Sequence, residues 1–120
     1  MRITGTDDFR VLHVDPDGPL VSKPGDANDL IGEAWGEENI SLIAVPAARF
    51  DPEFFRLRSL LAGEVLQKFV NYRLQLAIVG DIAAYLEASE ALRDFVWESN
   101  RGNHVWFVAD EAELEARLSR

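Results

Sequence analysis

Three aspartates stand at or a few residues beyond the ends of apolar segments that read as strands: Asp51, Asp81 and Asp110. If those strands run parallel, their carboxyl ends meet at one edge of a sheet, where open α/β sheets usually bind ligands. Carboxylates gathered at that edge could hold Mg²⁺. The simpler interpretation, which we favour, is that Asp51 and Asp110 cap helices and that Asp81 ends a strand.

Arg58 is the cation that helical periodicity after Asp51 places near this edge. In a helix that begins after Asp51, Arg58 would project close to the apolar residues Phe54 and Leu61. Its aliphatic stem would then lie on the core while its guanidinium reaches solvent. Alternatively, the guanidinium would be presented to an anion or a partner carboxylate. Asp51, Arg58 and Asp81 together form the candidate ligand edge.

The remaining side chains form no recognisable catalytic arrangement. His13 and His104 are the only histidines, and neither is accompanied by the nucleophile or carboxylate that a triad requires. The chain has no cysteine, which excludes a disulfide framework, a thiolate zinc site and cysteine catalysis. We therefore predict no catalytic residue, no metal and no cofactor.

Composition and charge restrict the class of protein further. The chain has 120 residues, of which 48% are hydrophobic and 28% charged, as expected for one globular domain. Its net charge of −9 repels phosphate backbones, which disfavours nucleic acid as a partner. No apolar run approaches the roughly 20 residues of a membrane span. The acidic N-terminal segment does not resemble a signal peptide, so we predict a cytoplasmic protein.

Turn and cap signals define the elements that position these residues. The expected strands are Phe9–Val14, a short one at Leu20–Val21, Ser41–Val45, Leu74–Val79 and Val105–Val108. The expected helices run from Asp26 to about Gly36, from Asp51 to about Tyr72, and from about Glu90 to Asn100 after a Ser89 cap, and a final helix is opened by Asp110 and Glu113. This order, β-β-α-β-α-β-α-β-α, predicts a single α/β domain over residues 1–120. Its sheet should be mixed but mostly parallel, with covering helices.

The C-terminal half of the chain resembles a known family. The segments LLAGEVLQKFVNYRLQLAIVGD (Leu60–Asp81) and LRDFVWESNRG (Leu92–Gly102), followed by a short apolar strand, are similar to the bacterial domain-of-unknown-function family 4180. The resemblance covers roughly Phe50 to Leu118 and, more loosely, the first strand. Because that family is uncharacterised, the resemblance implies no activity.

The expected element order is also similar to that of the STAS domain, the fold of anti-sigma-factor antagonists. In that family a Ser or Thr at the start of the helix after the third strand is phosphorylated, which switches partner binding. The matching place here, Phe50–Phe54, has no hydroxyl. Asp51 could imitate a permanent negative charge there or could simply cap the helix, and Ser59 lies two turns further on.

Two helices carry residues that a lone amphipathic pattern does not explain. Gly63 falls inside a predicted helix, where glycine costs about 1 kcal/mol relative to alanine. A close helix crossing, within the fold or across a dimer, would compensate, and Leu60 and Gln67 lie on nearly the same face. Trp97 points roughly 150° away from the buried stripe of its own helix, beside Arg93. Either a loop covers Trp97 or it faces a partner.

These features favour a non-catalytic protein-interaction or regulatory module of STAS-like type. The candidate interface comprises Leu60, Gly63, Gln67, Arg93 and Trp97. The expected partner is another protein or a second copy in a homodimer, the commonest closed arrangement. The alternative is a small enzyme or ligand-binding protein that uses the carboxyl edge of the sheet, although a fold alone never implies an activity.

Overall fold

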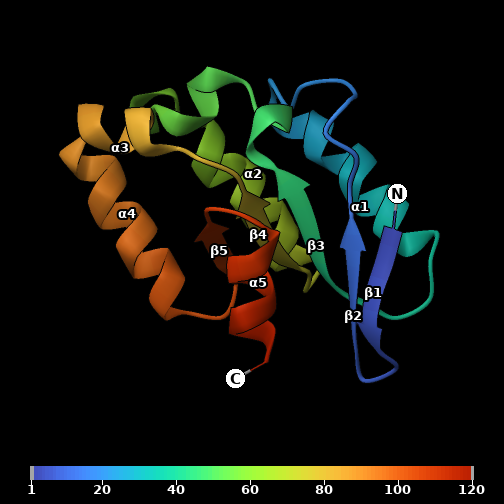
Figure 1. The fold of residues 1–120 in the computed structure, drawn as a ribbon. Coiled ribbons are helices and arrows are strands. Elements are labelled where there is room, and N and C mark those ends of the chain that lie inside the picture. Colours follow the sequence, from blue (N-terminus) through green and yellow to red (C-terminus); the bar gives the residue numbers. More distant parts are fainter. Residues whose placement is uncertain (1, 120) are drawn as a thin grey trace.

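The five strands lie side by side in the order in which they occur along the chain (Figure 1). The computed structural model describes residues 2–119. The strands are β1 (Arg2–Thr6), β2 (Phe9–His13), β3 (Ile40–Pro46), β4 (Gln75–Val79) and β5 (Val105–Val108). β1 is antiparallel to β2, and every later pair is parallel, so the predicted mixed, mostly parallel sheet is confirmed.

The helices cover the two faces of this sheet unequally. They are α1 (Ala27–Trp35), α2 (Leu61–Asn71), α3 (Ala83–Ala88), α4 (Glu90–Arg101) and α5 (Glu111–Leu118), with 3₁₀ turns η1 (Pro24–Asp26), η2 (Ala47–Arg49), η3 (Pro52–Phe55) and η4 (Leu57–Ser59). Connections between parallel strands of one sheet are right-handed, and here each one leads to the next strand on the same side of the previous strand. The connecting helices α1 to α4 therefore lie on one face of the sheet. Among the described residues, α5 is the helix on the other face (Figure 1).

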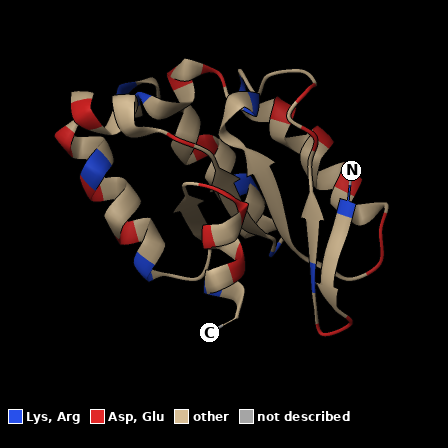
Figure 2. Ribbon diagram, in the orientation of Figure 1, with Lys and Arg blue, Asp and Glu red and all other residues tan. Residues whose placement is uncertain are grey.

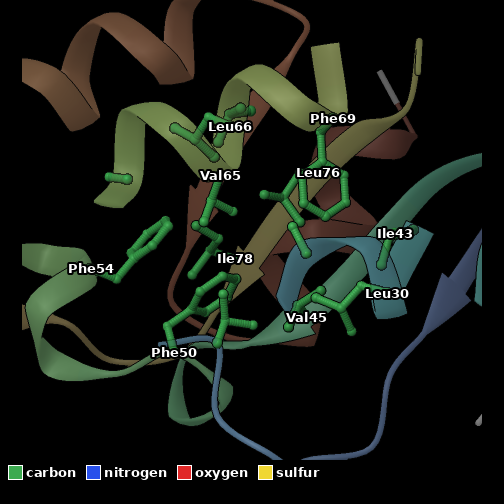
Figure 3. Close-up of a cluster of buried hydrophobic side chains, with 14 of the residues drawn as sticks. Leu30, Ile43, Val45, Phe50, Phe54, Val65, Leu66, Phe69, Leu76 and Ile78 are labelled. Atoms are coloured by element: carbon green, nitrogen blue, oxygen red, sulfur yellow. The ribbon is translucent and has the colours of Figure 1, made fainter. Parts of the chain in front are cut away.

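The larger core lies between the sheet and the helices α1 and α2 (Figure 3). Leu76 and Ile78 of β4 face Val65 and Phe69 of α2, and all four are at most 1% exposed. The apolar periodicity of the sequence predicts a common core, and all of its members are buried except Phe95, which is half-buried against it: Ile43, Val45, Leu61, Val65, Phe69, Leu76, Ile78, Phe95 and Phe107. The smaller core, on the other face, is formed by α5 and the strand residues Val11, Leu42, Ala44, Ala77 and Val108.

The first two strands differ from the prediction. β1 was not expected, because Ile3 is its only large apolar residue. It pairs with β2 as a hairpin around Asp7 and Asp8. The strand expected at Leu20–Val21 is instead a single bridge between Val21 and Phe50.

The predicted long helix from Asp51 to Tyr72 is also wrong, because the chain turns twice before α2 begins at Leu61. The Ser59 hydroxyl donates to the carbonyl oxygens of Glu53 and Arg56, at 2.7 and 2.8 Å, and so competes with helical bonding. Leu60 then adopts a left-handed conformation, with φ of 66°. Helical periodicity therefore does not apply across this segment.

A fourth difference is α3, a helix that was not predicted between β4 and α4. Asp81 accepts a hydrogen bond from the backbone N–H of Ala83 at 2.9 Å, which starts this short helix. The predicted Ser89 cap is confirmed, since its hydroxyl accepts from the N–H of Leu92 at 3.1 Å. The observed order is thus β-β-α-β-α-β-α-α-β-α.

Candidate functional site

The three aspartates of the carboxyl edge all bind backbone N–H groups at the starts of helical segments. Asp51 accepts from Glu53, Asp81 from Ala83 and Asp110 from Glu113, each at 2.9 Å. Glu113 in turn accepts from the N–H of Ala109, the residue before the Asp110 cap, at 3.0 Å, so the reciprocal bond of a capping box, to the N–H of Asp110 itself, is not formed. Among residues 2–119, no three His, Cys, Asp or Glu side chains form a group that could hold a metal ion.

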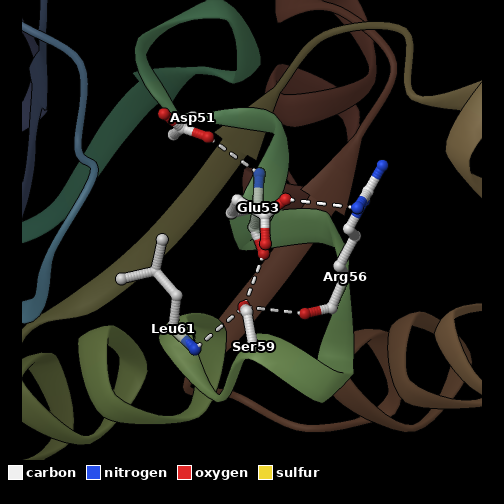
Figure 4. Close-up of polar contacts among 5 residues, drawn as sticks. All are labelled: Asp51, Glu53, Arg56, Ser59 and Leu61. Atoms are coloured by element: carbon white, nitrogen blue, oxygen red, sulfur yellow. Dashed lines mark hydrogen bonds and ion pairs between the residues drawn. The ribbon is translucent and has the colours of Figure 1, made fainter.

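Asp51 and Ser59 stabilise the irregular segment before α2 from its two ends (Figure 4). Asp51 begins η3 and also accepts a hydrogen bond from Ser22 at 3.3 Å. Besides its two donated bonds, the Ser59 hydroxyl oxygen accepts from the N–H of Leu61 at 3.2 Å. The Ser59 hydroxyl is therefore a connector between η3, η4 and the start of α2.

Arg58 does not lie along the core as predicted. It is exposed in η4, whereas the neighbouring Leu57 packs against the larger core. The reason is the break at Leu60, which separates Arg58 from the face that α2 buries. Arg56, rather than Arg58, makes an ion pair here, with Glu53 at 3.3 Å (Figure 4).

A crevice of about 250 Å³ opens between the carboxyl ends of β4 and β5. After β4 the chain continues to α3 on one face, and after β5 it continues to α5 on the other. This divergence is the position where α/β sheets commonly place ligands. The crevice contains Asp81, Asn100 and Glu113, but each already accepts a backbone N–H; for Asn100 the donor is Phe107, at 2.7 Å.

A second, wider groove of about 460 Å³ lies between the loop after β3 and the start of α3. Asp81 is its only charged lining residue, and most of the others are apolar, including Phe50 and Tyr85. Gly80 permits the close approach of the two loops, because a Cβ there would lie 2.8 Å from that of Ala47. Asp51 and Arg58 do not line this groove, so the three candidate ligand residues are not brought together.

The outer face of α2 carries the first half of the candidate interface. Leu60 is 65% exposed, and a Cβ added at Gly63 would meet nothing within 4 Å. Within the part of the chain that the structure describes, no neighbouring helix therefore explains Gly63. Gln67 is exposed on the same face and donates to Asn71 at 2.9 Å.

The second half lies on α4. Trp97 is 60% exposed, so no loop covers it, and its ring is contacted by the Arg101 guanidinium at 4.5 Å. Arg93 donates to the carbonyl oxygen of Leu86 at 2.6 Å and so caps the C-terminus of α3. This structural role of Arg93 was hidden because α3 itself was not predicted.

Comparison with known proteins identifies the family. The family model described as Domain of unknown function (DUF4180) matches residues 6–118. The chain belongs to this family. No curated protein and no solved structure matches it. The resemblance inferred from Leu60–Asp81 and Leu92–Gly102 is confirmed, and the match begins at Thr6, ahead of the first strand expected from the sequence.

His13, at the end of β2, is a buried ionisable group of the DUF4180 domain. It is only 8% exposed, and its Nε2 lies 2.8 Å from the Thr4 hydroxyl. Burial lowers the pKa of His13, and the charge of Arg2 lowers it further, against the smaller opposing effects of Glu111 and Glu115. The folded domain therefore favours the neutral imidazole.

This pKa predicts a stability that depends on pH. Below the ordinary histidine pKa of about 6.5, the unfolded chain binds a proton at His13 before the folded domain does. The free energy of unfolding should therefore decrease as the pH falls from this value towards the lowered pKa. In urea unfolding from about pH 7.5 to about pH 5, His13→Gln should show a shallower loss than the wild type. The exposed His104 provides the control, since His104→Gln should keep the wild-type slope; parallel curves for all three proteins would contradict the prediction.

Two features of the DUF4180 domain were missed from sequence. Arg49, only 8% exposed, donates to the carbonyl oxygens of Asp15 and Pro19 at 2.8 and 3.1 Å, which ties the loop after β2 to η2. An arginine in a loop carries no periodic signal that would reveal such burial. Trp35 and Tyr72 form an exposed edge-to-face pair, 5.0 Å between ring centroids, where α1 and α2 end. None of the helices in residues 2–119 has the length and apolarity needed to cross a bilayer.

Proposed function

We propose that the DUF4180 domain is a non-catalytic protein-interaction or regulatory module, with α2 and α4 on its binding surface. The carrying observation is Trp97, which is 60% exposed on a helix whose buried face is already satisfied by Leu92. Tryptophan is the residue type most enriched among interface hot spots. The carboxylates of the strand ends, by contrast, are used as caps.

The outer face of α2 supports the same function. Leu60 combines a left-handed backbone, which costs a non-glycine residue about 1–2 kcal/mol, with a side chain that is 65% exposed. Gly63 leaves the helix backbone open one turn later. Val70, which is 40% exposed, extends the exposed apolar surface further along the same helix. A partner that packs on this face would compensate for the left-handed backbone of Leu60 and for the helix propensity lost at Gly63.

The charges on α4 favour a second copy as that partner. Arg93 and Arg101 alternate with Glu90, Asp94 and Glu98 along its exposed side (Figure 2). A two-fold interface is formed by the same patch on both subunits, so it requires a patch that is complementary to itself. A helix face with both signs of charge around a tryptophan meets that requirement. We therefore propose a homodimer, in a cytoplasmic setting.

A more specific version of this proposal is that the domain has a STAS-like regulatory role. The sequential parallel strands with helices on one face support it, as does the position of Asp51 after β3. Asp51 would then supply a permanent negative charge in place of a phosphorylated hydroxyl. Its contacts with Ser22 and Glu53 hold that carboxylate at the exposed start of η3.

The association is tested by measuring mass with analytical ultracentrifugation at micromolar concentration. We expect the wild type to be dimeric and Trp97→Ala to raise the dimer dissociation constant at least about 25-fold, which corresponds to a hot spot of about 2 kcal/mol. Gly63→Leu should keep the monomer folded, because the added side chain enters open space, and should also block association. Trp35→Ala is the matched control, since Trp35 is equally exposed but lies outside the proposed surface. A wild type that stays monomeric excludes the homodimer, whereas a dimer unaffected by Trp97→Ala and Gly63→Leu would place the interface elsewhere.

One observation favours a second function, a small enzyme or ligand-binding protein. The 460 Å³ groove at the strand ends has an apolar lining and a single charged group, Asp81. If the aspartates act only as caps, Asp51→Asn should leave the melting temperature nearly unchanged, because Asn caps about as well as Asp. Addition of Mg²⁺ or Mn²⁺ should not raise it either. A saturable rise that disappears in Asp81→Asn would favour the second function.

A further inference from the structure

A groove of about 410 Å³ lies between the β1–β2 hairpin and α5, on the opposite face of the sheet from α2 and α4. Its floor is apolar and consists of Phe9, Val11 and Leu118. Its walls are formed by Gly5, Thr6, Glu115 and Ser119. The volume falls within the range of about 300–1,000 Å³ that is typical of ligand pockets.

The rim of this groove is acidic. Asp7 and Asp8 form the hairpin turn between the lining residues Thr6 and Phe9, and Glu115 of α5 lines the groove. Figure 2 shows acidic residues at this hairpin turn and on α5. None of these three carboxylates makes an ion pair within residues 2–119. Within the described residues, these carboxylates are therefore not neutralised by an ion pair.

The nearby cations are engaged elsewhere. Arg2 pairs with Glu111 at 3.0 Å, one turn from Glu115 along α5. Arg10 donates to the carbonyl oxygen of Glu38, away from the groove. The Arg117 guanidinium lies over the Trp106 ring at 4.3 Å and donates to a backbone carbonyl. No described arginine is left to neutralise the rim.

These charges discriminate among the possible occupants. Nucleic acid and anionic lipid would be repelled by the rim and by the net charge of −9. A second copy of the chain would bring the same negative charge and the same rim. A segment that carries both lysine or arginine and an aliphatic side chain would satisfy the rim and the floor together.

We propose that this groove binds a short basic segment of a partner protein. An aliphatic side chain of the segment packs on Phe9, Val11 and Leu118, and its flanking cations face Asp7, Asp8 and Glu115. This surface is separate from the one on α2 and α4, so it gives the domain a second, heterologous binding face. Either surface can fail its test without affecting the other.

The test is a titration of the ¹⁵N-labelled full chain, followed by amide chemical shifts. The probe is an acetylated, amidated hexapeptide of two leucines flanked on each side by two lysines. Two control peptides replace either the lysines by glutamates or the leucines by Gly-Ser. We expect only the probe to shift the amides of Gly5, Thr6 and Ser119 in a saturable manner, and its affinity should fall with added salt.

Substitutions in the chain complete the test. Glu115→Gln, at an exposed site, should weaken binding about two- to fivefold, the effect of one surface ion pair. Leu118→Ala should weaken it further by removing part of the floor. Glu64→Gln on α2 is the matched control and should bind as the wild type does. The proposal is overturned if no titration saturates, if the Gly-Ser peptide binds equally well, if the shifts map elsewhere, or if Glu115→Gln has no effect.

Discussion

Replacing Leu76 or Ile78 by alanine is expected to lower the free energy of unfolding by about 2–5 kcal/mol. Both side chains belong to β4, which lies between β3 and β5, and both face α2 with at most 1% exposure. Truncation removes buried apolar area and leaves a cavity that the close-packed surroundings fill only partly. Urea unfolding at neutral pH measures the loss.

The control for this prediction is Val70→Ala. Val70 is 40% exposed on α2, so its truncation should change the free energy of unfolding by no more than about 0.5 kcal/mol. Losses below about 1 kcal/mol for both Leu76→Ala and Ile78→Ala would mean that β4 is not central to the core.

A loss of similar size, about 2–5 kcal/mol, is expected for Leu114→Ala. Leu114 is the one fully buried side chain of α5 among the described residues, and it packs on the strand residues Leu42, Ala44 and Ala77. Because α5 is so short, much of its attachment depends on this contact. Hydrogen exchange should therefore become faster in α5 and in the face of the sheet beneath it.

Ala116→Ser is the matched control, since Ala116 is exposed on the same helix. It should cost only the difference in helix propensity, about 0.5 kcal/mol. If Leu114→Ala and Ala116→Ser lowered the free energy of unfolding equally, the Leu114 contact would not be what attaches α5 to the second face of the sheet.

The buried strands and the helix caps could be predicted because their signals are local. The run Leu74–Val79 is apolar at nearly every position, as a strand covered on both faces must be. Ser89 and Asp110 stand where helix caps are expected, and the structure uses both as caps. Neither signal depends on the rest of the fold.

Three elements could not be predicted because nonlocal contacts or single side chains decide them. β1 is an edge strand with one large apolar residue, and its pairing with β2 gives it its structure. The hydroxyl of Ser59 binds two backbone carbonyls and so breaks what reads as a continuous helix. Asp81 was read as the end of a strand, although its carboxylate also starts α3.

From the sequence, the candidate interface could be recognised only as residues that do not fit the amphipathic patterns of their helices. Sequence periodicity indicated that Gly63 and Trp97 lie off the buried faces of their helices. Only the fold shows that no other described residue approaches the open side of Gly63 and that Trp97 remains 60% exposed. Arg58 fails for a related reason, because its expected position depended on a helix that does not form there.

Hydrogen exchange at two protein concentrations tests the central claim most directly, because it locates the binding surface as well as detecting it. Amide exchange of the wild type is compared well below and well above the dimer dissociation constant. We predict that backbone amides around Gly63 and Gln67 on α2, and around Trp97 on α4, exchange more slowly at the higher concentration. The same amides in Trp97→Ala should show no such change. Rates that do not depend on concentration, or protection confined to other elements, would contradict the account.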